Sequence, residues 1–152
     1  MVDPKFRHLF DVEFETIPQI VGDVPMGFFR RTGMIQSGRF QGPVLQGTVL
    51  PGGGDWLIKR SDGVIHLNVR AMLQTLDGDA IYMTYEGRLK GPSDMDQRIA
   101  RGDTIDPGEL YFRTLVQFEA GAPALLWMND IVAVGIGSRH PNGPHYSIHQ
   151  LL

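Results

Sequence analysis

The sequence predicts an all-β protein, a single antiparallel β-barrel that is closed or nearly closed and spans residues 1–152. Nineteen glycines and ten prolines divide the chain into short segments, as turns do in all-β proteins. Several segments alternate apolar and polar residues, which is the period of a half-buried strand. We count about eight to ten strands, a number that closes into a barrel or packs as a sandwich, and we favour the barrel.

The first third of the chain predicts two strands and a glycine-rich loop. Residues 6–15 form a strand whose apolar face carries Phe6, His8, Phe10, Val12 and Phe14. Residues 17–31, rich in proline and glycine, leave the sheet, and residues 38–50 are a glycine-bent strand. Residues 50–56 contain three consecutive glycines. Because glycine tolerates positive φ, they predict a tightly folded loop or a mobile flap.

Two Asp-Gly pairs predict hairpins in the middle of the chain. Asp62 and Asp77 are each followed by glycine, a combination that favours the turns of two-residue hairpin loops. They join residues 56–59, 64–75 and 80–89 into successive antiparallel strands.

The last third predicts three more strands. Residues 90–108 are polar and read as a long exposed loop, a kind of segment that is often functional or mobile. Strands follow at 110–119, 131–137 and 145–151. Between the first two of these, residues 123–130 predict one short helical turn.

Composition and charge narrow the function classes. The chain is 42% hydrophobic and 20% charged, as expected of a soluble globular domain. Its net charge is -3 without a basic stripe, so we expect no nucleic acid as a partner. It has no cysteine, which excludes disulfides and thiolate chemistry. Without an apolar stretch of about 18 residues or a signal-peptide layout, we expect no membrane association and a cytoplasmic location.

Three regions occur in a characteristic order. They are GTVLPGGGDW at residues 47–56, DGVIHLNVR at 62–70, and YFRT, WMN and VGIG between residues 111 and 137. In this combination the chain resembles the domain of unknown function 3237 family over residues 14–151. The resemblance implies a β-barrel of calycin-like appearance with a central cavity, and it implies no reaction. Asn68 departs from the family's pattern, in which we expect an aspartate.

Asp55, Arg70 and Tyr85 are the candidate catalytic residues. Asp55 follows the three glycines, and a carboxylate in a partly apolar pocket acquires a raised pKa that suits an acid or base near neutral pH. Arg70 supplies a rigid fork of donors for a carboxylate, phosphate or enolate oxygen. Tyr85 lies among apolar neighbours, so its buried hydroxyl needs a partner, whether it serves a cavity or only the fold.

Seven further residues are candidates for binding a substrate. His66 and Asn68 share one strand face with Arg70, at steps of about 7 Å, a pattern that an outward-facing strand shows as well. Tyr111 and Arg113 share a face of a later strand, where the arginine has nearby carboxylates as alternative partners. The remaining three are two aromatic walls and an amide: Trp56, Trp127 and Asn129. Alternatively, Trp127 closes one end of the barrel and Asn129 supports the backbone there.

Several sharper motifs are absent. The three glycines are not followed by the Gly-Lys-Ser/Thr of a phosphate loop, and residues 135–137 lack the third glycine of a dinucleotide fingerprint. His145 and His149 lie about 13 Å apart along one strand, and His140 and His145 have no third ligand nearby in sequence. No serine occupies a nucleophile elbow. We therefore expect neither a cofactor nor a metal.

Three functions stay open. The first is an enzyme without a cofactor that moves protons next to a carbonyl group, as isomerases, dehydratases and carbon–carbon lyases do. The second is a binding or carrier barrel for a small apolar ligand, with residues 90–108 as its gate. The third is a structural protein with a solid barrel, joined into a homodimer through its last strands. A barrel interior without a void would favour the third.

Overall fold

Nine strands make up the protein, and every pairing between them is antiparallel. The computed structural model describes residues 1–152. The first five strands are β1 (Phe6–Val24), β2 (Phe28–Gln41), β3 (Gln46–Asp55), β4 (Ile58–Arg60) and β5 (Ile65–Thr75). The other four are β6 (Ala80–Lys90), β7 (Tyr111–Ala120), β8 (Ala133–His140) and β9 (Gly143–Leu151).

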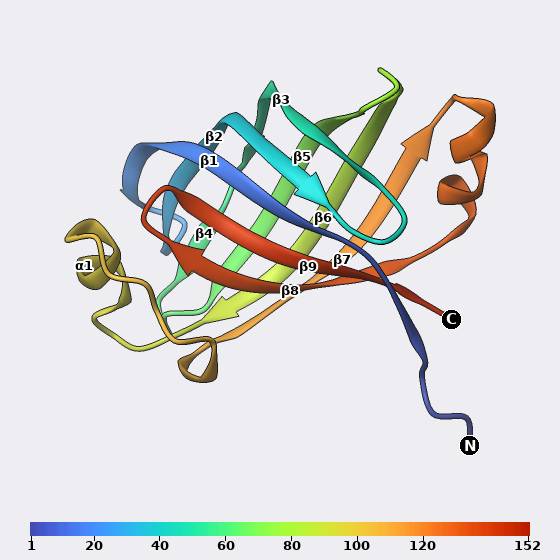
Figure 1. Cartoon of the computed structure of the whole chain (residues 1–152). Coiled ribbons are helices and arrows are strands. Elements are labelled where there is room, and N and C mark those ends of the chain that lie inside the picture. Colours follow the sequence, from blue (N-terminus) through green and yellow to red (C-terminus); the bar gives the residue numbers. More distant parts are fainter.

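The strands run round in a ring (Figure 1). Their order is β1-β9-β8-β7-β6-β5-β3-β2, and β1 pairs with β2 as well as with β9. The short β4 pairs with both β2 and β5 at one end. Because a ring leaves few strand edges unpaired, the sheet needs no second sheet to cover its edges. The predicted all-β, near-closed barrel and its strand number are confirmed.

The middle of the chain folds as predicted. Gly63 and Gly78 have φ angles of 87° and 89°, the left-handed region that hairpin turns require. Along β5 and β6 burial alternates with every residue, and Ile65, Val69 and Tyr85 are on the inside. The polar face of β5 lies on the outside of the barrel.

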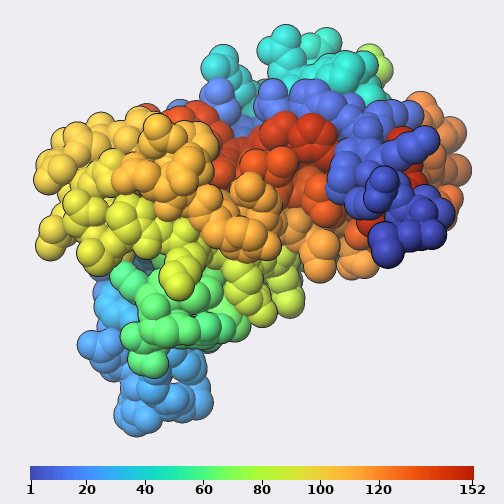
Figure 2. Space-filling view, turned by 90° about the horizontal axis from the view of Figure 1, so that it is seen from below, coloured from blue at the N-terminus to red at the C-terminus, as the bar shows by residue number.

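The prediction for residues 17–31 is wrong. Instead of leaving the sheet, β1 and β2 continue as one long hairpin with a turn at Gly27, where φ is 97°. Pro18 fits because the pairing of β1 with β9 ends at Glu13, so a missing N–H costs no bond on that side. Figure 2 shows the tip of the hairpin, in light blue, projecting from the body of the molecule.

The predicted apolar face of residues 6–15 is broken by a bulge. Leu9 is an extra residue between the pairs that His8 and Phe10 make with β9. Leu9 and Phe10 are both fully buried, whereas Phe6 is 50% exposed. An extra residue shifts the alternation by one, so Phe6 and His8 do not share the inner face of Phe10.

The three glycines belong to strand β3 and form neither a loop nor a flap. Gly52 has a φ angle of 107°, and the register of β3 with β5 shifts just before Gly54. A Cβ atom on Gly53 would lie 2.3 Å from the carbonyl oxygen of Arg70. Glycine lets the bulged strand pass this close to β5, and the strand then continues to Asp55.

Helical segments lie at opposite ends of the barrel (Figure 1). The predicted turn at 123–130 is the 3₁₀ segment η2 (Pro123–Asp130). The predicted loop 90–108 contains a short helix, α1 (Met95–Ala100), and the single turn η1 begins within it (Pro107–Glu109). No helix is both long enough and apolar enough to cross a membrane.

The barrel interior is more completely filled toward η2 than toward α1. Toward η2, the ring centroid of Phe10 lies 5.2 Å from that of Phe40 and 6.1 Å from that of Phe118. Leu125 and Met128 of η2 are buried in the same core. Toward α1, the inward side chains leave a cavity, and this half holds the candidate site.

Candidate functional site

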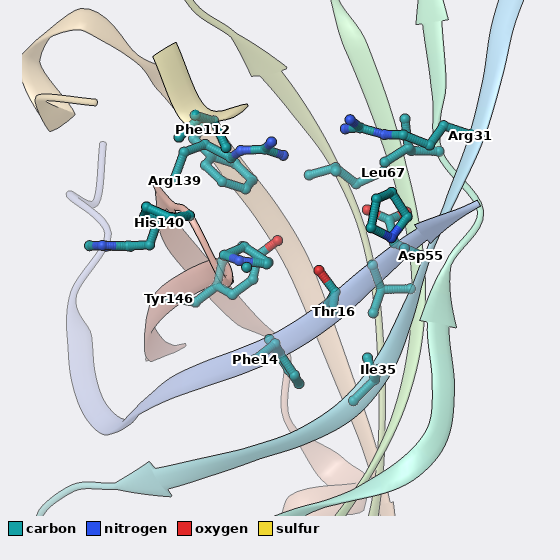
Figure 3. Close-up of a pocket in the computed structure, with 18 of the residues that line it drawn as sticks. Phe14, Thr16, Arg31, Ile35, Asp55, Leu67, Phe112, Arg139, His140 and Tyr146 are labelled. Atoms are coloured by element: carbon teal, nitrogen blue, oxygen red, sulfur yellow. The ribbon is translucent and has the colours of Figure 1, made fainter. Parts of the chain in front are cut away.

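A cavity of about 370 Å³ lies at the α1 end of the barrel. Its inner wall is mostly aromatic and aliphatic: Phe14, Ile35, Leu67, Val69 and Phe112. Its polar side chains come from six strands and from the loop that carries α1: Thr16, Arg31, Asp55, Tyr85, Asp96, Arg139, His140 and Tyr146. Figure 3 labels all of these except Tyr85 and Asp96. An apolar pocket of this size with a few polar groups is typical of small-molecule sites. The interior is therefore not the solid one that a purely structural barrel would have.

The carboxyl group of Asp55 enters the cavity from the end of β3. Asp55 is in register with Gly33 of β2 and Val69 of β5, and Val69 pairs with Tyr85 of β6. Asp55 Oδ1 accepts a hydrogen bond of 3.0 Å from the backbone N–H of Asn68. Burial raises the pKa of Asp55 to about 6, although this hydrogen bond and nearby arginines oppose it. Near neutral pH the group can therefore both give and take a proton.

Two tyrosines meet in the cavity wall. The ring centroids of Tyr85 and Tyr146 are 5.1 Å apart at 66°, with Phe14 and Phe112 packed edge-on to Tyr146 at 6.0 and 5.1 Å. Burial raises the pKa of both tyrosines, so both keep their hydroxyl proton. The hydroxyl of Tyr146 is buried beside that of Tyr85, which influences its pKa, and makes no hydrogen bond of ordinary geometry. It is a donor available to a ligand oxygen.

Two arginines complete the polar part of the cavity. Figure 3 shows Arg31, from β2, and Arg139, from β8, reaching toward the middle from opposite walls. Burial lowers the pKa of Arg139, and the like charge of Arg31 lowers it further.

The structure brings together only two of the ten predicted site residues, Asp55 and Tyr85. Trp56 directly follows Asp55, and neighbouring strand residues point to opposite faces. Arg70 is exposed, with its Cζ 5.3 Å from the ring centroid of Trp56 on the outer surface. Asn68 is also exposed and reaches the site only through its backbone N–H.

The remaining predicted residues lie outside the cavity as well. His66 shares the outer face of β5, and Tyr111 and Arg113 share that of β7, where Arg113 Cζ lies 5.5 Å from the Tyr111 ring centroid. Trp127 and Asn129 are in η2, at the far end of the barrel.

These two residues of η2 have structural contacts. Trp127 packs against the hydrophobic core, and Arg7 Cζ lies 5.2 Å from its ring centroid. Asn129 accepts a hydrogen bond from the N–H of Ala120 and donates one to its carbonyl oxygen, at 3.0 and 2.8 Å. Trp127 therefore closes one end of the barrel and Asn129 supports the backbone there, which are the alternatives given above to a role in binding.

Sequence reasoning missed Arg31, Arg139 and Tyr146. Strand parity in residues 145–151 contains a signal for Tyr146, since it alternates with polar neighbours and shares its face with the buried Ile148. Arg31 fell in the segment that was predicted to leave the sheet. Arg139 lies beyond the predicted end of its strand, and the pairing of β8 with β9 continues to His140.

The histidines pair on the surface and at the rim. The rings of His140 and His145 stack with centroids 3.7 Å apart, and those of His8 and His149 are 5.0 Å apart. No group of three or more histidine and acidic side chains is arranged to hold a metal ion.

Comparison with known proteins places the chain among relatives of the same length and fold. It is 33% identical over 142 residues to a UPF0311 protein of Rhodopseudomonas palustris, covering 90% of this chain and 93% of that protein. The crystal structure of that conserved protein of unknown function superposes with a TM-score of 0.91 over 100% of both chains, at 29% identity.

Two further solved structures have the same architecture. A β-barrel-like protein of Acinetobacter baumannii superposes with a TM-score of 0.83 at 30% identity, covering 100% of this chain and 98% of that one. An enzyme from Penicillium herquei superposes with a TM-score of 0.75 at 20% identity, covering 100% and 97%. The family described as "Protein of unknown function (DUF3237)" matches residues 4–151. The chain therefore belongs to the DUF3237 family.

Proposed function

We propose that the protein is an enzyme that uses no cofactor and transfers a proton next to a carbonyl group of a small molecule. The observation that carries this proposal is the placement of Asp55 in a mostly apolar cavity together with two protonated tyrosines. A base and oxyanion donors within one pocket are the parts that such chemistry needs.

In the proposed step the Asp55 carboxylate removes a proton from the carbon next to the carbonyl. The C–H electron pair moves into the new carbon–carbon double bond, and the carbonyl oxygen becomes an enolate oxygen. The hydroxyls of Tyr85 and Tyr146 donate hydrogen bonds to that oxygen. Asp55 then returns the proton at another atom, which gives an isomer. Alternatively, a group on the next carbon leaves with its bonding electron pair and takes the proton from Asp55, which gives an elimination product.

Two properties of the site support these roles. A carboxyl group with a pKa of about 6 has a driving force for proton transfer matched to neutral pH. Tyrosines whose pKa is raised by burial remain donors throughout the reaction. The likeness to the Penicillium enzyme extends to the fold alone, and it is consistent with a barrel that houses chemistry.

The experiment that tests the proposal is hydrogen–deuterium exchange at carbon. The protein is incubated in D₂O with a panel of small ketones, enones and keto acids, and loss of the α-proton signal is followed by ¹H NMR. We expect exchange above the buffer rate for at least one compound, and a decrease of about a hundredfold or more in Asp55→Asn. Asp77→Asn, a change in the exposed β5–β6 turn, is the matched control.

The pH profile adds a second readout. We expect the exchange rate to rise with an apparent pKa near 6, because the carboxylate is the base. Saturable binding of panel compounds with exchange no faster than in Asp55→Asn would contradict the proposal and leave the carrier function in its place.

A further inference from the structure

The two arginines of the cavity have no partner within the protein. Neither Arg31 nor Arg139 takes part in any ion pair of the structure. The Nε atom of Arg139 is buried and has no hydrogen-bond partner. Both side chains line the cavity and extend toward its middle (Figure 3). Their donors therefore face the space that a ligand would occupy.

Leaving these cations unpaired costs stability. An arginine stays charged in proteins, so the half-buried Arg139 bears a desolvation cost and the repulsion of Arg31 as well. A buried charge without a partner is strongly unfavourable, and polar groups left unsatisfied in a native structure call for an explanation. An anionic ligand that supplies the missing acceptors is such an explanation.

The charges of Asp96 and Asp55 act favourably on Arg139, but neither carboxylate forms an ion pair with either arginine. Asp96 Oδ2 accepts from Lys59 Nζ at 3.3 Å and is thereby shared with another cation. Asp55 has a pKa of about 6 and is partly protonated near neutral pH. If Asp96 and Lys59 are counted as a neutral pair, the cavity holds two positive charges, on Arg31 and Arg139, and at most one negative charge, on Asp55.

We propose that the substrate of the reaction proposed above is an organic acid, a small aromatic or apolar carbonyl compound whose carboxylate is bound by Arg139 and Arg31. The planar guanidinium fork matches the two oxygens of a carboxylate. The apolar part of the compound lies against Phe14, Phe112 and the tyrosines, and its carbonyl group lies within reach of Asp55. The arginines are thus the specificity-determining residues of the site.

The test compares an acid with its neutral ester. Benzoylformate and methyl benzoylformate share an aromatic ring and a ketone and differ in the charge, and neither has an α-proton that Asp55 could remove. Isothermal titration calorimetry gives their affinities without turnover. We expect the wild-type protein to bind the acid about ten- to a hundredfold more tightly, as bonds between charged groups allow.

Variants assign the preference to the arginines. Arg139→Gln should lose it, Arg31→Gln should reduce it, and Arg139→Lys, which keeps the charge without the fork, should retain a part. Arg70→Gln removes an arginine from the outer surface and should bind like the wild type. If Arg139→Gln does not fold, the acid-to-ester affinity ratio is compared in Arg31→Gln and Arg139→Lys instead, and it should be reduced in both.

The outcomes separate this inference from the proposed reaction. Asp55→Asn should keep the preference for the acid, because the base is not part of the anion site. No saturable binding of benzoylformate, equal affinity for acid and ester, or an undiminished preference in Arg139→Gln would each overturn the inference. In a further outcome, the protein binds the acid more tightly than the ester and yet exchanges no α-protons of any compound. That result would support the anion site and would contradict only the proposed proton transfer.

Discussion

At Asp55, burial and hydrogen bonding act on the pKa in opposite directions. The N–H of Asn68 and the charges of Arg31 and Arg139 favour the carboxylate, and desolvation favours the neutral acid more strongly. Asn68 contributes its backbone N–H rather than its side chain to this balance. The protein thus holds an acid in an environment that destabilises its charged form, as active sites commonly do.

This balance predicts a pH-dependent effect of Asp55→Asn on stability. The native pKa of about 6 lies above the ordinary aspartate value of 3.8, so the native state binds the proton more tightly than the unfolded chain. Asp55 therefore lowers the free energy of unfolding as pH rises from about 4 to about 6. Relative to wild type, the variant should gain on the order of 3 kcal/mol between pH 4 and pH 8.

Urea denaturation of both proteins at a series of pH values measures this gain. The amide keeps an acceptor for the N–H of Asn68, so the variant should fold. A difference between the two proteins that stays constant from pH 4 to pH 8 would mean that the carboxyl group is not desolvated in the native state.

Among the elements, β3 depends most on close backbone approach. Its bulge brings Gly53 against the carbonyl oxygen of Arg70 and sets the register in which Asp55 opposes Val69. The glycines of β3 thus determine the direction in which the Asp55 side chain points, although none of them lines the cavity.

Gly53→Ala should destabilise the protein by about 1–3 kcal/mol, because its Cβ would lie 2.3 Å from a backbone oxygen that cannot move without breaking the β3–β5 pairing. Gly121→Ala is the matched control, since a Cβ there meets nothing within 4 Å. Chemical denaturation followed by tryptophan fluorescence measures both. Equal stability of the two variants would contradict the close approach of β3 to β5.

Local patterns predicted the elements whose structure is set locally. Alternation along β5 and β6 and the Asp-Gly turns gave these strands, their turns and their buried faces, including the inward position of Tyr85. Bulges are different, because an extra residue such as Leu9 is accommodated by the partner strand. The three consecutive glycines of β3 are a second example. By themselves they predict a loop, and only the close approach of Gly53 to strand β5 shows that they form a bulge within a strand.

The cavity residues were harder to predict for a related reason. Alternation assigns two faces to a strand without saying which half of a barrel each residue reaches. The polar face of β5, which alternation makes the natural place for binding residues, is the outer face. Arg139 and Arg31 lie inside, on strands whose ends were set by pairing with β9 and β1 rather than by their own sequence.

On the scale of the whole molecule, the barrel divides stability from function. The half near η2 is packed with phenylalanines and aliphatic residues, and the half near α1 contains the cavity, with the unpaired polar atoms of Asp96, Arg139 and Tyr146 in its lining residues. Large-to-small changes in the packed half, such as Phe10→Ala, should cost about 3–5 kcal/mol. Changes in the hollow half should alter ligand binding instead.

Gly33→Leu tests this division by filling the hollow half. Gly33 lines the cavity, and a Cβ there would lie 3.9 Å from Thr16 and 4.0 Å from Asp55, with no positive φ to strain it. The leucine side chain should therefore enter the cavity, bury apolar surface and leave the free energy of unfolding unchanged or higher. Binding of benzoylformate by calorimetry should be weakened, whereas Gly33→Ala, which adds one methyl group, should retain it. An unchanged affinity in a stably folded Gly33→Leu protein would contradict a ligand site beside Gly33.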